Sequence, residues 1–320
     1  MYIAPKRIRS GSRVAIVAPA STFSTEELHA GLDVIRESGL EPVVGPCVKN
    51  LNTSIYRSAP VQERVQELSW AFSSPDISAV IAVKGGEGSA AVLPFLDYDL
   101  IRKSRKPFLG KSDITAISMG ILAKSGLINI NGRGASIKID DYRKNFFDMN
   151  CQALRDTLTL LMSDQSWGSK PFLKNQHFPR TVSPGRAHGK AVGGNCDTFS
   201  HLLGTDFLPD LSGAILFLED VNKGPEELSR LFLHMKLAGV LRSVSGVVLG
   251  EFVDTNPKKR FKEEIEDVIL EYFSEGPPCM YGVSFSHGSY TCPIPMGADC
   301  AMDADTGSIL FDFKMFPAVR

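Results

Sequence analysis

The sequence predicts an α/β protein whose first half is a doubly wound parallel sheet, and three observations support this fold class. Short apolar runs alternate with amphipathic helical segments over roughly the first 130 residues. The run at residues 79–83, AVIAV, is continuously apolar, which is typical of a strand covered on both faces. Glycines stand at or just after the ends of two of the runs, at Gly85 and Gly110, where open parallel sheets bind their ligands.

The first half begins with a predicted strand at residues 13–18 and a helix at residues 24–38. Ser24 and Glu27 form a capping box, and apolar residues recur at helical spacing after it. The same patterns predict further strands at residues 42–44 and 127–130, a strand ending at residue 109, and helices around residues 61–72, 89–93 and 113–121.

The second half is separated from the first by a stretch without periodicity. Residues 164–188 contain prolines, glycines and polar residues, so we predict a linker between domains at residues 1–163 and 189–320. The second domain is predicted to contain strands at residues 214–218, 245–250 and 281–285, helices at residues 225–237 and 262–273, and a terminal hairpin at residues 298–302 and 308–311.

Composition excludes several classes of protein. The hydrophobic share of 43% and the net charge of -1 are those of a globular protein with no general attraction for nucleic acid or acidic membranes. No segment is long and apolar enough to span a bilayer, and residues 14–18 are too short for the core of a signal peptide, so we expect a cytoplasmic protein. The six cysteines form no C-x-x-C pair, which argues against a zinc site or a disulfide framework.

Ser112 occupies a corner between a predicted strand and a predicted helix. The preceding run ends at Gly110, and Ile114 begins the apolar stripe of the following helix. Such a corner exposes a hydroxyl beside the unbonded N–H groups of a helix start, as a nucleophilic serine requires. The alternative is that Ser112 only caps the helix, a frequent role for serine.

Two further polar residues follow predicted strands. Glu219 comes after the apolar run AILFL, and His287 follows the run ending at Phe285. A histidine can take the proton of a serine hydroxyl near neutral pH, and a carboxylate can orient that histidine. The alternatives are a helix cap or a lysine partner for Glu219 and an ordinary loop position for His287.

The segment from Gly85 to Gly88 is a glycine-rich loop whose N–H groups suit an anion. It is interpreted either as half of an oxyanion hole, with the Asp113 N–H as the other half, or as a flexible turn. The sequence Gly110-Lys111-Ser112 also matches the end of a P-loop. The first glycine of that motif would fall on Arg105, so we reject a P-loop.

Considered together, these segments resemble the LD-carboxypeptidase family of serine peptidases, which includes the microcin-immunity peptidases. The resemblance covers nearly the whole chain. It rests on the stretches 14–21 (VAIVAPAS), 85–97 (GGEGSAAVLPFLD), 110–115 (GKSDIT), 193–195 (GGN), 215–221 (ILFLEDV), 238–241 (AGVL), 246–252 (GVVLGEF) and 285–297. It implies a Rossmann-like N-terminal domain with a parallel sheet, a smaller β-rich C-terminal domain, and a homodimer.

The resemblance also implies the residues of the site. The family's Ser–Glu–His triad falls on Ser112, Glu219 and His287, and its oxyanion donors fall on the amides of Gly86 and Asp113. The implied activity is release of the terminal D-alanine from a murein tetrapeptide in cell-wall recycling, without a metal or an organic cofactor.

Several positions around the implied pocket depart from the family pattern. They are Glu87 for an aromatic residue, Lys111 for a tyrosine, Ser286 for a glycine, Lys223 and the pair Pro225-Glu226 after the glutamate, and Arg133 for a proline. We expect Glu87 and Lys111 to contact substrate and to form an ion pair across the mouth of the pocket. These departures leave two alternatives open: a microcin-immunity peptidase acting on an acyl-nucleotide conjugate, and a non-catalytic binding protein.

Overall fold

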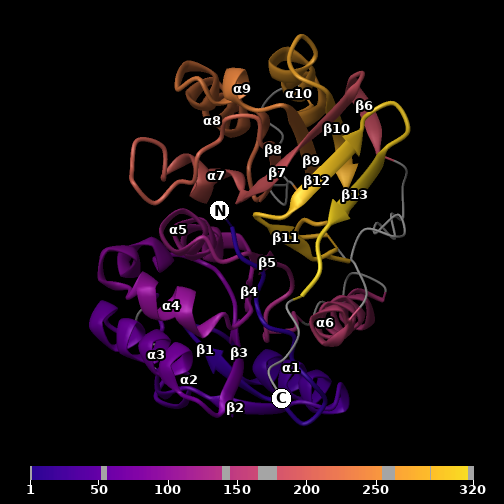
Figure 1. Cartoon of the computed structure of the whole chain (residues 1–320). Coiled ribbons are helices and arrows are strands. Elements are labelled where there is room, and N and C mark those ends of the chain that lie inside the picture. Colours follow the sequence, from indigo (N-terminus) through magenta and orange to yellow (C-terminus); the bar gives the residue numbers. More distant parts are fainter. Residues whose placement is uncertain are drawn as a thin grey trace.

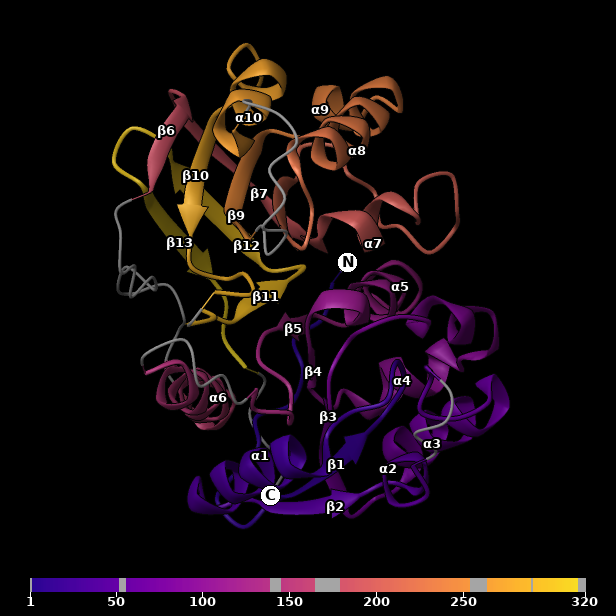
Figure 2. The same cartoon turned by 180° about the vertical axis from the view of Figure 1, so that it is seen from behind.

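The structure is a computed structural model that describes residues 2–51, 56–138, 145–164, 179–253, 264–288 and 290–315. The described residues form two β-sheets, each packed against helices, which appear as the lower and upper parts of the molecule in Figure 1 and, from behind, in Figure 2. The fold is mixed α/β, as the alternating pattern of the sequence predicts.

The first sheet has six strands in the order β11-β5-β4-β3-β1-β2 within the described residues. Strands β1 to β5 are parallel, which confirms the predicted parallel sheet, and β11 is antiparallel to β5. The strands are β1 (Arg13–Val17), β2 (Glu41–Val44), β3 (Ile77–Ala82), β4 (Phe108–Gly110), β5 (Asn129–Asn131) and β11 (Ile294–Met296).

Helices cover both faces of this sheet. Helices α1 and α6 lie together on one side of it, and α3 and α4 lie on the other (Figure 1). These elements are α1 (Thr25–Glu37), α2 (Pro46–Lys49), α3 (Val61–Ser73), η1 (Ser89–Phe95), α4 (Tyr98–Ser104), η2 (Ser112–Ile114), α5 (Thr115–Ser125) and α6 (Phe146–Met162). Because strands β1, β3 and β4 are covered on both faces, their side chains are almost entirely buried.

The second sheet has seven strands in the order β13-β12-β7-β8-β9-β10-β6 within the described residues. Strands β7 to β10 are parallel, and β6, β12 and β13 pair antiparallel at the two edges. The strands are β6 (Arg180–Ser183), β7 (Arg186–Asn195), β8 (Ile215–Val221), β9 (Gly246–Val253), β10 (Cys279–Val283), β12 (Asp299–Asp303) and β13 (Ser308–Asp312). The hairpin of β12 and β13 confirms the predicted terminal hairpin.

The helices of the second half are α7 (Cys196–Ser200), α8 (Pro225–Leu237), α9 (Val240–Ser243) and α10 (Ile265–Phe273). Helix α8 has the bounds that its periodicity predicts. Phe232 on α8 packs edge-on against Phe273 on α10, with 4.9 Å between the ring centroids. Helix α7 contacts α5, so it joins the two halves of the molecule.

Three features differ from the sequence-based expectations. The segment after the glycine loop is the 3₁₀ helix η1, which contains Pro94, rather than an α-helix. Glu219 and Asp220 lie inside β8 rather than after it, because their backbone continues the pairing with β7 and β9. Helix α6 is absent from the predicted elements.

Part of the predicted linker at residues 164–188 is strand. Strand β6 pairs with β10, and the first residues of β7 pair with β12, so these residues complete the second sheet. Residues 165–178 of that linker lie outside the described residues. In addition, β11 from the second half of the sequence pairs with β5 in the first sheet. The division at residues 1–163 and 189–320 stays a prediction.

Candidate active site

Ser112 stands at a sharp corner between β4 and α5, as the sequence predicts. Its backbone has φ +64°, a left-handed conformation that a residue other than glycine rarely adopts. The 3₁₀ helix η2 starts at this residue, so the N–H groups that follow have no preceding helical turn to bond. A strained corner of this kind holds a serine hydroxyl out from the sheet.

The glycine-rich loop after β3 packs directly against this corner. A Cβ atom on Gly85 would lie 2.8 Å from the Asp113 nitrogen and 2.8 Å from the Ser112 Cβ, so only glycine allows this approach. The backbone of Gly86 has φ +107°, and the next N–H, of Glu87, donates to Ser21 Oγ over 2.8 Å. The amides of Gly86 and Asp113 therefore belong to two segments in close contact.

His287 and Glu219 are hydrogen-bonded, with 2.6 Å between His287 Nδ1 and Glu219 Oε2. The Glu219 side chain is 2% exposed, so it holds the imidazole inside the protein. Burial opposes ionisation of this carboxyl, but His287, Lys111 and Asn195 outweigh burial and lower its pKa. Burial also lowers the pKa of His287, with Lys111 and Arg133 acting in the same direction against Glu219, so the imidazole stays neutral near pH 7.

A hydrogen-bond network anchors the strand that carries Glu219. Asn195 Nδ2 donates to Asp220 Oδ1 over 3.0 Å, and the Asn195 N–H donates to Thr115 Oγ1 over 2.9 Å. Thr115 is the first residue of α5, immediately after the Ser112 corner. Burial, together with the Glu219 charge, raises the pKa of Asp220 to about 6. This network ties the carboxylate to the helix that follows the serine.

Ser112 and His287 line one cavity of about 360 Å³. Its wall includes the glycine loop after β3, the corner after β4, the loop after β5 and the end of β8. The cavity thus lies at the carboxyl ends of the parallel strands, where the strand order predicts a ligand site. A serine hydroxyl, an oriented imidazole and backbone N–H groups are the components of an acyl-transfer site.

Lys111 and Glu87 do not form the ion pair that the sequence suggested. The Lys111 ammonium is buried and donates to the Ser286 carbonyl over 2.8 Å and to Thr291 Oγ1 over 3.4 Å. Burial, together with the nearby Arg133 charge, lowers its pKa to about 7. Glu87 is exposed and lies outside the lining of the cavity. Lys111 therefore holds the loop that carries His287, and its ammonium does not point at a phosphate site.

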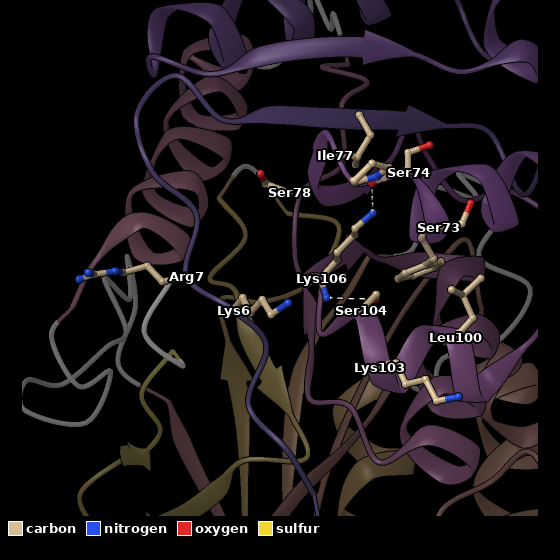
Figure 3. Close-up of a pocket in the computed structure, with 12 residues that line it drawn as sticks. Lys6, Arg7, Ser73, Ser74, Ile77, Ser78, Leu100, Lys103, Ser104 and Lys106 are labelled. Carbon is tan, nitrogen blue, oxygen red and sulfur yellow. Dashed lines mark hydrogen bonds between the residues drawn. The ribbon is translucent and has the colours of Figure 1, made fainter. Parts of the chain in front are cut away.

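A second hollow, of about 510 Å³, lies at the opposite end of the first sheet (Figure 3). It is lined by Lys6, Lys103 and Lys106 together with several serines. The Lys106 ammonium donates to the carbonyls of Ala71 and Ser74 over 2.8 and 2.6 Å, so it caps the end of α3. Figure 3 shows the side chains of Arg7 and Lys103 directed away from it, so the cations of this hollow do not converge on one point.

Comparison with known proteins identifies the family. Residues 14–132 match the model of the LD-carboxypeptidase N-terminal domain, and residues 188–302 match that of its C-terminal domain. The chain is 31% identical to the probable murein peptide carboxypeptidase of Bacillus subtilis, over 93% of this chain and 91% of that protein. The chain belongs to the LD-carboxypeptidase family. Membership of this family supports a peptidase function.

Other members of the LD-carboxypeptidase family are about as similar. The microcin C7 self-immunity protein MccF of Escherichia coli is 30% identical over 91% of this chain and 90% of that protein. The structure of MccF in complex with aspartyl sulfamoyl adenosine superimposes with a TM-score of 0.84 at 25% identity, covering 98% of this chain and 99% of that chain. The two-domain fold of this family member is thus that of MccF.

The structure brings together most of the residues that the sequence predicted for the site. Ser112, Gly86 and His287 line the cavity, and Glu219 lies behind His287. Sequence reasoning noted Arg133 only as a departure from the family pattern, although this buried guanidinium also lines the cavity. Its position three residues after the predicted strand at residues 127–130, next to a glycine, is the signal that would have found it.

Proposed function

We propose that this protein is a serine carboxypeptidase that hydrolyses the L,D-amide bond of a murein tetrapeptide and releases the terminal D-alanine. The observation that carries the proposal is that Ser112 and His287 line one cavity while Glu219 holds the far side of the imidazole. The proposed catalytic residues are Ser112, Glu219 and His287.

The proposed reaction begins with attack of Ser112 Oγ on the carbonyl carbon of the L-centre. His287 takes the hydroxyl proton on Nε2, because Nδ1 is bonded to Glu219. Collapse of the tetrahedral intermediate breaks the C–N bond, and His287 gives the proton to the departing amine of D-alanine. Water, deprotonated by the same imidazole, then hydrolyses the acyl-enzyme and restores the serine.

The amides of Gly86 and Asp113 are the proposed oxyanion donors. Both belong to segments in contact at the Ser112 corner, and the preorganised N–H groups of such segments stabilise the negative charge that develops on the substrate oxygen. The Asp113 carboxylate accepts from the Ser89 N–H over 2.8 Å, which ties the donor-bearing turn to η1. No step of this mechanism requires a metal or an organic cofactor.

A second candidate function is cleavage of an acyl-nucleotide conjugate. It is favoured by the likeness to MccF, whose structure is known with aspartyl sulfamoyl adenosine. The two functions share the proposed triad and differ in the leaving group.

The expected setting for the first function, the carboxypeptidase, is the cytoplasm, with the enzyme acting as a homodimer. Within the described residues, no helix has both the length and the apolar character needed to cross a membrane.

The test is incubation with a disaccharide tetrapeptide and, separately, with an aspartyl sulfamoyl nucleotide. We expect the parent enzyme to release D-alanine, identified by chiral chromatography, and the Ser112→Ala and Glu219→Gln variants to lose roughly 10³-fold or more in rate. Ser118→Ala is the matched control, because Ser118 is a buried serine on the neighbouring helix α5 and lies outside the cavity lining.

Each outcome decides between the candidates. Cleavage of the nucleotide conjugate without release of D-alanine would establish the second function. Binding of the tetrapeptide without cleavage by the parent would indicate a non-catalytic binding protein. A Ser112→Ala variant as active as the parent would refute the proposed nucleophile.

A further inference from the structure

Arg133 lies beside the proposed nucleophile because of the register of two neighbouring strands. Strands β4 and β5 are parallel, with Gly110 opposite Asn131, and the Gly132 N–H donates to the Gly110 carbonyl over 3.1 Å. Ser112 follows Gly110 by two residues, and Arg133 follows Asn131 by two. Parallel strands lie about 4.8 Å apart, so the two residues leave the sheet as neighbours.

The loop that carries Arg133 has little freedom to move. The Ala135 N–H donates to the Ala82 carbonyl over 3.0 Å, and the Ser136 N–H donates to the Val83 carbonyl over 2.8 Å. A Cβ atom on Gly134 would lie 2.4 Å from the Ala82 oxygen, so this glycine permits close contact of the loop with the end of β3. The backbone beside Arg133 is therefore held at the ends of both neighbouring strands.

Positive charge predominates in the cavity. Among the described residues, the lining includes four cations, Lys84, Lys111, Arg133 and Lys138, and one carboxylate, Glu27. Lys84 and Lys138 are exposed, whereas the Lys111 ammonium already donates to the Ser286 carbonyl. Glu27 accepts a bond from Ser136 Oγ over 2.8 Å.

Arg133 is a buried cation in the wall of the cavity, and neighbouring strands fix the backbone beside it. It is 9% exposed, and its charge lowers the pKa of both Lys111 and His287, which places the guanidinium near both groups. Two cations buried close to one imidazole repel each other in a site of low dielectric. An anion bound at Arg133 would relieve that repulsion.

We infer that Arg133 binds the free terminal carboxylate of the peptide substrate and so restricts hydrolysis to the last residue of the chain. The inference rests on the proposed function, because it assigns this carboxylate to a peptide that Ser112 attacks. In such a substrate three bonds separate the scissile carbonyl carbon from the carboxylate carbon, which places them about 3–4 Å apart. A cation in the loop after β5, the strand next to β4, meets this requirement, and a guanidinium binds a carboxylate through two parallel N–H donors.

The experiment compares the murein tetrapeptide with the same peptide bearing a terminal carboxamide, in the parent and in Arg133→Met. We expect the parent to favour the free acid by about 10- to 100-fold in kcat/KM, the usual contribution of a charge-assisted bond. Both proteins are assayed at a pH above their acid limbs, because loss of the Arg133 charge also raises the pKa of His287. In Arg133→Met the preference falls to about 1 because the rate on the free acid drops toward the slower rate on the carboxamide. A circular dichroism spectrum that matches that of the parent shows that the variant is folded.

Two further variants sharpen the result. Arg133→Lys keeps the positive charge but lacks the two parallel N–H donors of the guanidinium, so it recovers part of the preference for the free acid. Lys138→Met is the matched control, because it removes an exposed cation from the same cavity wall, and it should keep the preference of the parent. An Arg133→Met variant that loses activity equally on both peptides, or that still prefers the free acid, overturns the inference while the proposed function stands.

Binding decides the inference if the parent cleaves neither peptide. Titration calorimetry with the two peptides is then carried out on Ser112→Ala and on Ser112→Ala combined with Arg133→Met. Tighter binding of the free acid that disappears with Arg133→Met supports the carboxylate site although the proposed hydrolysis has failed. Equal binding of the two peptides, or no binding of either, overturns it.

Discussion

His287 is an imidazole whose surroundings oppose its protonation. Burial lowers its pKa, and the charges of Lys111 and Arg133 add to this effect, while the Glu219 carboxylate opposes it. As the proposed base, His287 must be unprotonated before it can accept a proton from Ser112. Because its pKa lies below the usual 6.5, the imidazole remains competent at mildly acidic pH.

The pH dependence of kcat/KM follows from these charges. We expect its acid limb to have a midpoint below about 6.5, the value of an unperturbed histidine. In Lys111→Met one repelling cation is gone, so the pKa of His287 rises and the acid limb moves to higher pH. Lys84→Met is the control for loss of an exposed cavity cation and should leave the midpoint in place. An acid limb that Lys111→Met leaves unmoved would contradict this electrostatic coupling.

Lys111 also holds the backbone next to His287 in place. Its ammonium bonds the carbonyl of Ser286, the residue before His287, across 175 positions of sequence. The lysine therefore positions the loop that carries the proposed base. Its depressed pKa, about 7, reflects the burial that this position demands.

At the scale of elements, the site depends on loops at the ends of strands and on what holds them. The glycine loop between β3 and η1 carries the proposed oxyanion donor Gly86. Ser21 accepts from the Glu87 N–H over 2.8 Å, and Arg64 Nη1 donates to the Gly88 carbonyl over 2.8 Å. These two bonds come from a loop and a helix, so neighbouring elements fix the orientation of the loop.

Removal of one of these bonds should lower the rate of the chemical step. We expect Ser21→Ala to reduce kcat by about 10-fold with little change in KM, because a displaced amide weakens stabilisation of the transition state more than binding of the substrate. Steady-state kinetics on the tetrapeptide measure both constants. Ser38→Ala is the control, because Ser38 caps the opposite, C-terminal end of α1 and does not line the cavity. A Ser21→Ala variant that changes only KM would show that the loop binds substrate instead.

At the scale of the whole molecule, the two sheets are joined by more than one connection. Strand β11 follows the strands of the second sheet in sequence but pairs with β5 in the first. The Asn195 N–H at the end of β7 donates to Thr115 Oγ1 at the start of α5. The residues that line the cavity therefore come from both halves and require their mutual alignment.

This linkage predicts that the two sheets unfold together. Hydrogen exchange followed by mass spectrometry should give strands β3 and β8 the same opening free energy, because neither sheet retains its partner contacts alone. Thr115→Val removes the acceptor of the Asn195 N–H and should lower protection in both strands by about 1–3 kcal/mol. Protection that falls in β8 alone would show that the halves unfold independently.

The chain order of the elements and the chemical nature of the site were readable from the sequence. Continuous apolar runs predict buried strands wherever they occur, so β1, β3 and β8 were located closely, and the glycine at Gly110 marked the corner that Ser112 occupies. The short strand β11 and the helix α6 were missed. A three-residue strand has too few residues to show periodicity, and β11 exists because β5 offers it an edge.

By itself, then, the sequence determined which segments are buried strands, and which hydroxyl, carboxylate and imidazole stand near their carboxyl ends. It could do so because local patterns of burial and turn chemistry are properties of neighbouring residues. Only the tertiary structure decided that Lys111 turns inward to Ser286, that Glu87 stays outside the cavity, and that Arg133 reaches into it. Those positions depend on strand register and on contacts between residues far apart along the chain, and such contacts form only once both sheets are assembled.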